Sequence, residues 1–148
     1  QKVQELADRE VIRELIAKYA HNIARGYSVA DMFTEDGVFI TRTPAGPPKE
    51  VGPKSAITKM YEEAIPKRLD TPKPQIHNYV IVINGNDAKG VCSNELRTRT
   101  QDQSIIASGY YDDVFRKENG RWKFVVRDAT FFHWVPLQQG WAKSNAPL

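Results

Sequence analysis

Residues 104–134 read SIIASGYYDDVFRKENGRWKFVVRDATFFHW, and this stretch decides the fold. It contains two strand-like runs, Ser104–Arg116 and Arg121–Trp134, joined by the turn Glu118-Asn119-Gly120. A polar group that points from such a sheet into a concave face would lie in a dry cavity with aromatic walls. The hairpin therefore predicts a pocket for a small apolar molecule. Its aromatic residues are Tyr110, Tyr111, Trp122, Phe124, Phe131, Phe132 and Trp134.

The residues upstream of this hairpin predict helices first and strands afterwards. Apolar residues at spacings of three and four indicate a first amphipathic helix that ends near Gly26: Ile12, Leu15, Ile16, Tyr19 and Ile23. The four prolines and two glycines of Thr43–Pro53 predict a loop and a candidate lid, whereas Pro53 favours the start of a helix over Lys54–Ile65. Further strands are predicted at Val38–Thr41, Gln75–Ile83 and Ala88–Thr100.

Helices followed by a run of hairpins are typical of an α+β domain. We therefore expect the helices to pack on one face of a curved antiparallel sheet. The chain of 148 residues is long enough for a single domain, 1–148, that buries about two-thirds of its surface on folding.

Composition excludes several classes of partner. The formal charge of +3 comes from 21 Lys and Arg against 18 Asp and Glu, in a mixed pattern that predicts no nucleic-acid partner. The single cysteine, Cys92, excludes an internal disulfide, and the three histidines add no cluster with metal-ligand spacing. A reducing, cytoplasmic compartment fits this cysteine usage. No apolar stretch approaches the roughly 20 residues of a membrane span, so no membrane partner is expected.

Strand alternation predicts which polar side chains face the interior. In Ala88–Thr100 the odd positions are polar, so the even positions, among them Cys92 and Asn94, are expected to face the core. On the next strand the odd positions place Tyr111 in the cavity. His77, near the start of its strand, is expected to share a face with Tyr79, Ile81 and Ile83, close to a rim.

Several short motifs follow one another along the chain: Asp8–Leu15 with Tyr19, Met32–Phe39, His77 before Ile81–Ile83, Gly109–Tyr111, Asn119–Phe124 and Val135–Leu137. Their order and spacing resemble the SnoaL-like branch of the nuclear transport factor 2-like superfamily over nearly the whole chain. Within it, the chain is most similar to the scytalone dehydratase and lindane dehydrochlorinase group. The resemblance implies a cone-shaped fold whose open end holds the ligand. It also implies eliminations, isomerisations or hydrations that need no cofactor, although the same cone serves elsewhere as a binding module.

The same resemblance implies roles for individual residues. His77 takes the position of the family's catalytic histidine, the base that removes a proton next to the leaving group. Tyr111 and Arg127 are the other candidate catalytic residues, and with Asn94 they would bind the oxygen on which negative charge grows. The candidate substrate-binding residues are Tyr19, Asn22, Phe39, Cys92, Asn94 and Phe132.

One position departs from the family's pattern. In the dehydratase and dehydrochlorinase, an aspartate near the end of the first helix orients the histidine and stabilises its protonated form. Ala24 matches that position here, and a gap in the alignment would bring Asn22 there instead. Asn22 can orient an imidazole but cannot neutralise its charge. Either the dyad is absent, or another carboxylate, such as Asp113 or Asp128, supplies the charge.

The candidate residues also fit structural roles. His77 fits a hydrogen-bonded structural histidine, and the tyrosines fit core aromatics whose hydroxyls are satisfied. Arg127 interrupts the apolar run Phe124–Val126, which is costly unless the guanidinium meets a ligand or pairs with Asp113 or Asp128.

These observations favour a lyase of the dehydratase type, or an isomerase, that acts without a cofactor on a small aromatic or polycyclic substrate with His77 as base. Water or another small group, for example formaldehyde, would leave. The alternative is a non-catalytic ligand-binding or assembly module of the same fold, and the missing aspartate is the argument for it. The apolar tail Phe131–Trp141 predicts self-association, as a trimer if the chain follows the dehydratase group and as a dimer if it follows the wider superfamily.

Overall fold

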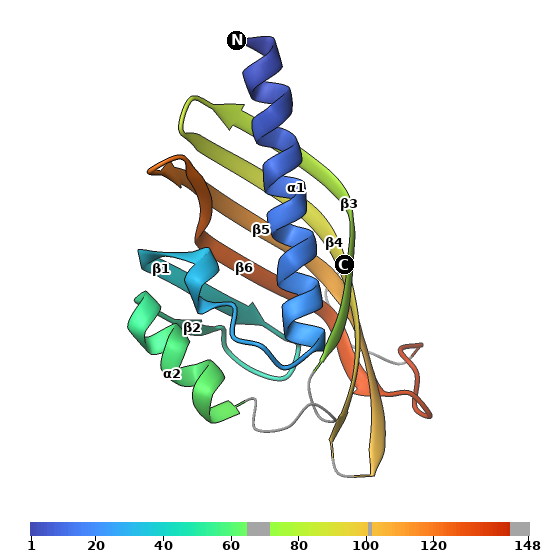
Figure 1. Ribbon diagram of the computed structural model, residues 1–148. Coiled ribbons are helices and arrows are strands. Elements are labelled where there is room, and N and C mark those ends of the chain that lie inside the picture. The colour runs from blue at the N-terminus through green and yellow to red at the C-terminus, as the bar shows by residue number, and fades with distance from the viewer. Residues whose placement is uncertain (65–71, 101, 143–148) are drawn as a thin grey trace.

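The computed structural model of the protein describes residues 1–64, 72–100 and 102–142. This part of the chain contains two α-helices, α1 (Lys2–Ala24) and α2 (Lys54–Ala64), and a short 3-10 helix, η1 (Ala30–Met32). Six strands form one sheet in the order β2-β1-β6-β5-β4-β3 (Figure 1). They are β1 (Phe33–Arg42), β2 (Lys49–Val51), β3 (Lys73–Asn84), β4 (Asp87–Thr100), β5 (Gln103–Glu118) and β6 (Arg121–Pro136).

The sheet is strongly curved, does not close on itself and carries the helices on its concave face, so the predicted α+β class is confirmed (Figure 1). Neighbouring strands pair antiparallel as expected, except that β1 runs parallel to β6, with Val38 opposite Val126. The alternation of side chains within a strand carries no information about its direction relative to a strand far away in the sequence. The sequence therefore did not predict this parallel β1–β6 pairing, which makes the sheet mixed.

Helix α1 buries the face that its sequence predicted. Ile12, Ile16, Tyr19 and Ile23 are buried against the sheet, and Asp8 near the start of the helix is buried with them. The Asp8 carboxylate accepts hydrogen bonds from Lys117 Nζ at 2.8 Å and from Trp122 Nε1 at 2.9 Å. At the other end of α1, Lys73 Nζ donates to the carbonyl oxygen of Ala24 at 2.8 Å. These bonds fix the direction in which α1 crosses the sheet.

The predicted alternation holds on β4 and β5. Cys92 and Asn94 are each 1% exposed, and Tyr111 is 4% exposed, so all three side chains point into the interior. Cys92 lies opposite Tyr111 in the β4–β5 register.

Strand β3 departs from the predicted alternation. Its pairing with β4 shifts between His77 and Val80, and Asn78 within the shift has a positive φ of 59°. This bulge adds one residue, which moves the side chains before it to the opposite face. His77 lies opposite Ser93 and is exposed on the outer face of the sheet. The expectation that His77 shares a face with Tyr79, Ile81 and Ile83 is therefore wrong.

The proline-rich segment Thr43–Pro53 is not a loop throughout. Strand β2 lies within it and pairs with β1 at the edge of the sheet, with Val51 opposite Phe39. Prolines on both sides limit this strand to three residues, since proline cannot continue a sheet ladder. Helix α2 starts at Lys54, as predicted. Its predicted end, Ile65, lies outside the described residues.

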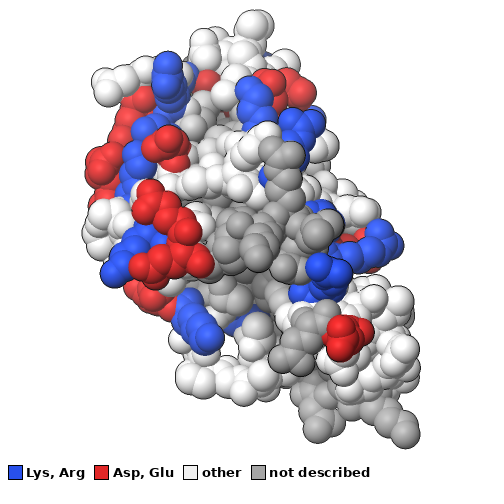
Figure 2. Space-filling view, turned by 60° about the horizontal axis from the view of Figure 1, so that its bottom comes forward, with Lys and Arg blue, Asp and Glu red and all other residues white. Residues whose placement is uncertain are grey.

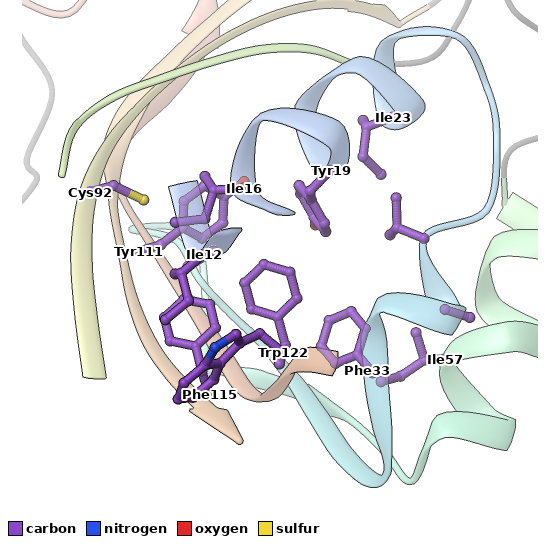
Figure 3. Close-up of a cluster of buried hydrophobic side chains, with 14 of the residues drawn as sticks. Ile12, Ile16, Tyr19, Ile23, Phe33, Ile57, Cys92, Tyr111, Phe115 and Trp122 are labelled. Atoms are coloured by element: carbon purple, nitrogen blue, oxygen red, sulfur yellow. The ribbon is translucent and has the colours of Figure 1, made fainter. Parts of the chain in front are cut away.

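The buried side chains form one cluster between the helices and the sheet (Figure 3). Phe33, Phe115 and Phe124 are fully buried, and the ring of Phe124 lies 5.4 Å from that of Phe33 and 5.1 Å from that of Phe115. These rings fill the end of the concave face near the β5–β6 turn. The open space of the cone lies towards the other end of these strands.

Candidate functional site

The concave face holds a cavity of about 260 Å³ between the two helices and the sheet. This volume is below the roughly 300 Å³ at which drug-sized sites begin, so the cavity suits a small ligand. Its walls are aromatic and aliphatic, and none of the described lining residues carries a charged side chain. They are Tyr19, Ile23, Phe39, Thr41, Met60, Tyr61, Pro72, Pro74, Leu96, Tyr111, Ala129, Phe131 and Trp134.

Tyr19 and Tyr111 meet where α1 faces the sheet (Figure 3). Their rings are edge-on, with centroids 6.2 Å apart. Arg127 does not line the cavity but lies against both rings, with its Cζ atom 3.6 Å from the centroid of Tyr111 and 4.1 Å from that of Tyr19. In the β5–β6 register, Arg127 lies two residues before Ala129, the partner of Tyr111, on β6. The two tyrosine rings therefore separate the guanidinium from the cavity.

Arg127 and Asp113 form a buried ion pair behind these rings. Arg127 Nη1 lies 3.6 Å from Asp113 Oδ2, and the polar side-chain atoms of both residues lack hydrogen bonds within the described protein. Burial raises the pKa of Asp113 to about 7, although the charge of Arg127 opposes this shift. Burial also disfavours the charged form of Arg127, but the charge of Asp113 outweighs that effect and raises the pKa of the guanidinium. Arg127 is thus charged at neutral pH while Asp113 titrates near neutrality.

The hydroxyl groups of three tyrosines reach the cavity region. Tyr19 Oη and Tyr61 Oη lie 3.4 Å apart. Burial raises the pKa of Tyr61 to about 12 and raises the pKa values of Tyr19 and Tyr111 well above their usual value. All three phenols therefore keep their protons at neutral pH and act as hydrogen-bond donors.

Sequence reasoning missed Tyr61. This residue is 8% exposed on α2, one turn after the fully buried Ile57. The spacing of four between Ile57 and Tyr61 indicates the inner face of that helix, and it is the signal that could have found the residue. The position of that face over Tyr19 depends on how α2 packs.

The structure brings most of the predicted residues together. Tyr19, Phe39 and Tyr111 line the cavity, and Arg127 lies behind its tyrosines. Cys92 and Asn94 are buried beside Tyr111 and Leu96 on the same face of the sheet. Burial raises the pKa of the Cys92 thiol to about 12, which keeps it protonated and unreactive. Neither side-chain polar atom of Asn94 has a hydrogen-bond partner among the described residues.

Two predicted substrate-binding residues lie elsewhere. Phe132 is 42% exposed on the outer face, where its ring contacts Tyr110. Its neighbour Phe131, opposite Gly109, lines the cavity instead, because successive side chains of a strand point to opposite faces. Asn22 is half-buried on α1 and is not among the residues that line the cavity.

His77 does not line the cavity. Its side chain is 48% exposed on the outer face, with Nε2 3.6 Å from Oε2 of Glu95. The bulge residue Asn78 donates a hydrogen bond to Ser93 on the same side. The role of His77 as a general base therefore stays a prediction from the family resemblance.

Neither the one face shown in Figure 2 nor the metal-ligating residues that the structure describes give a competing site. Basic and acidic side chains are interspersed on the face shown in Figure 2. Within the described ranges, no group of three or more His, Cys, Asp and Glu side chains has an arrangement that could hold a metal ion. No described helix is both long and apolar enough to cross a membrane.

The architecture defines an α+β cone with a small ligand cavity, and comparison with known proteins gives its family. A SnoaL-like domain family matches residues 4–128, so the chain belongs to this family. None of the curated protein sequences compared with the chain matches it.

Solved structures with the same fold are distant in sequence. A candidate scytalone dehydratase from Novosphingobium aromaticivorans has a TM-score of 0.80 at 18% identity, covering 92% of this chain and 91% of its own. Hexachlorocyclohexane dehydrochlorinase LinA-type3 from Novosphingobium barchaimii has a TM-score of 0.78 at 15% identity, covering 93% of this chain and 94% of its own. An NTF2-like protein with a cystatin-like fold, also from Novosphingobium aromaticivorans, has a TM-score of 0.68 at 19% identity, with coverages of 88% and 85%. At these identities the likeness establishes the NTF2-like fold.

Proposed function

We propose that this protein binds a small aromatic or polycyclic compound in the cavity of the cone and acts on it as a cofactor-independent lyase or isomerase. The observation that carries the proposal is the partly open aromatic cavity of about 260 Å³, lined by the phenols of Tyr19, Tyr61 and Tyr111. Two structural neighbours are named as a dehydratase candidate and a dehydrochlorinase, which supports an elimination.

The phenols supply the stabilisation that such an elimination needs. Negative charge grows on a substrate oxygen or on the leaving group, and neutral hydroxyl donors in a dry site stabilise that charge. Arg127, 3.6 Å from the Tyr111 ring, adds a positive charge behind these donors without touching the ligand. Arg127 therefore acts in this proposal through Tyr111 and Tyr19.

One observation favours a second candidate function, a non-catalytic ligand-binding module. None of the described residues that line the cavity is a carboxylate or an imidazole, so none would serve as a general base at neutral pH. In the lyase proposal the proton acceptor is either His77, after a change in the conformation of β3, or a group on the substrate itself.

Adjacent tyrosines on β5 provide a matched test. Tyr111 faces the cavity, whereas Tyr110 contacts Phe132 on the outer face of the sheet. A crystal soaked with small phenols should show the compound against Tyr19 and Tyr111. Incubation with a hydroaromatic alcohol, which unlike a phenol can lose water by elimination, should then give a product that is lighter by one water in mass spectrometry, and chromatography would resolve an isomer of unchanged mass. We expect Tyr111→Phe to slow this conversion at least about tenfold and Tyr110→Phe to leave it unchanged.

Binding without any conversion would support the non-catalytic module, and binding outside the cone would contradict both functions.

A further inference from the structure

Two hydroxyl groups from different helices meet at the wall of the cavity. Tyr19 comes from α1 and Tyr61 from α2, and their hydroxyl oxygens are 3.4 Å apart. Both side chains line the cavity and both are more than nine-tenths buried, at 3% and 8% exposure. This pair is the polar contact between the two helices at the ligand site.

The number of protons in the pair determines what it offers to a ligand. Each neutral phenol has one hydrogen to donate, and its oxygen accepts. One hydroxyl donates to the other, so the hydrogen of the second hydroxyl is left to point elsewhere. A phenol that also accepts a hydrogen bond is a stronger donor than an isolated one.

The cavity contains few groups that could accept this hydrogen. Most of the described lining side chains are hydrocarbons or the thioether of Met60, and the other polar ones are Thr41, Tyr111 and Trp134. A ligand oxygen that reaches the pair gains this hydrogen bond, whereas a ligand without an acceptor leaves a buried donor unpartnered, which weakens binding.

We infer that the Tyr19–Tyr61 pair is a subsite for an oxygen atom of the ligand. The substrate class is then an aromatic compound that carries a carbonyl or phenolic hydroxyl group, in preference to a hydrocarbon or a halogenated hydrocarbon of the same shape. A phenolic ligand hydroxyl accepts from the free hydrogen of the pair and can donate in return to the other tyrosine oxygen. A site built to hydrogen-bond a substrate oxygen discriminates strongly against the analogue that lacks it.

This inference rests on the proposed function, because it assumes that the cavity is the ligand site. It narrows that function by naming the feature of the ligand that the site selects. Tyr61 is then a specificity-determining residue.

A pair of ligands of equal shape tests the subsite. 2-Naphthol and 2-methylnaphthalene differ by a hydroxyl in place of a methyl group, and their binding is measured by NMR titration of the wild-type protein. We expect 2-naphthol to bind at least about tenfold more tightly, the scale of one or two hydrogen bonds. Tyr61→Phe keeps the ring and removes the hydroxyl, so it should reduce this ratio to about twofold by weakening 2-naphthol alone.

The control is Tyr110→Phe, on the outer face of the sheet, which should leave the ratio unchanged. Tyr19→Phe gives a second test of the pair if Tyr61→Phe does not fold. Three results would overturn the inference. They are equal affinities of the wild type for the two ligands, an unchanged affinity ratio in the Tyr61 and Tyr19 variants, and no binding of either ligand. Discrimination here without conversion of the hydroaromatic alcohol would keep the subsite and reject the lyase, whereas conversion of that alcohol without discrimination here would keep the lyase and reject the subsite.

Discussion

Arg127 Nη1 lies 3.6 Å from Asp113 Oδ2, and both side chains are fully buried on neighbouring strands. The two residues face each other in the β5–β6 register, one layer behind the tyrosines of the cavity. The guanidinium also lies against the rings of Tyr19, Tyr111 and Phe124. A charge in this position is stable only with its partner, and the first two predictions follow from that dependence.

Removal of one partner of the pair should cost much more than removal of both. Asp113→Leu leaves the Arg127 guanidinium, which stays charged, buried and unpaired, and we expect a loss of about 3–5 kcal/mol in the free energy of unfolding. The double variant Arg127→Met with Asp113→Leu should recover most of that loss. Urea denaturation measures the free energy of unfolding of the wild type, the single variant and the double variant.

A surface pair gives the control for this prediction. Arg42 Nε lies 2.9 Å from Asp128 Oδ1, but the Arg42 side chain is 45% exposed. Arg42→Met should cost at most about 1 kcal/mol, the usual value for exposed pairs. Similar losses in Arg42→Met and Asp113→Leu would contradict the interpretation of Arg127 as a buried charge that needs Asp113.

The pH dependence of stability should report Asp113. Burial raises its pKa from 3.8 to about 7 in the folded protein. Between these values the folded state holds a proton that the unfolded state has released, so stability falls as pH rises through this window. We expect the wild type to lose more stability between about pH 5 and about pH 8 than Asp113→Asn, which cannot ionise. Equal losses in urea titrations of the two proteins would show that the carboxyl group has an ordinary pKa.

The position of His77 predicts a small effect of its replacement. The side chain is half exposed on the outer face, and the cavity lies on the other side of the sheet. If a group on the substrate accepts the proton, turnover of a true substrate should stay within about twofold in His77→Gln. Loss of a general base would instead reduce turnover at least about 100-fold. A loss of that size in kcat, with an intact fold by circular dichroism, would show that β3 rearranges to bring His77 to the ligand.

Gly109 cannot accept a side chain. A Cβ atom there would lie 1.8 Å from the backbone oxygen of Thr130 and 2.8 Å from Cα of Phe131. Because Phe131 lines the cavity, Gly109→Ala should lower the free energy of unfolding by about 3 kcal/mol or more and also weaken ligand binding. Gly46→Ala is the control, since a Cβ at Gly46 meets no heavy atom within 4 Å. Equal melting temperatures for the two variants would contradict the close approach of β5 and β6 at Gly109.

The tail should mediate self-association. Leu137 and Trp141 are each 56% exposed, and Phe132 is 42% exposed on the adjoining outer face. Exposed apolar residues gathered in this way mark interfaces. We expect an oligomer by light scattering at micromolar concentration, and a shift towards the monomer in Leu137→Asp. Val3→Asp, at a residue 80% exposed on α1, should leave the mass unchanged. A monomeric wild type at this concentration would contradict the prediction.

The sequence by itself determined the features that depend on local patterns. The spacing of Ile12, Ile16, Tyr19 and Ile23 fixes the buried face of α1, because an α-helix repeats every 3.6 residues. Alternation on β4 and β5 places Asn94 and Tyr111 inside, because neighbouring side chains of a strand point to opposite faces. The Asn119-Gly120 turn, where both residues have positive φ, joins the last two strands where predicted.

Only the tertiary structure decided which segments meet. The bulge at Asn78 reverses the alternation that placed His77 inside, and the sequence around it carries no signal of an added residue in the pairing. The parallel pairing of β1 with β6, and the approach of Tyr61 to Tyr19, join residues that are distant along the chain. A periodic pattern reports the face of one element and leaves open which face of another element will cover it. The packing of these elements against one another creates the cavity, the Tyr19–Tyr61 pair and the buried Asp113–Arg127 pair.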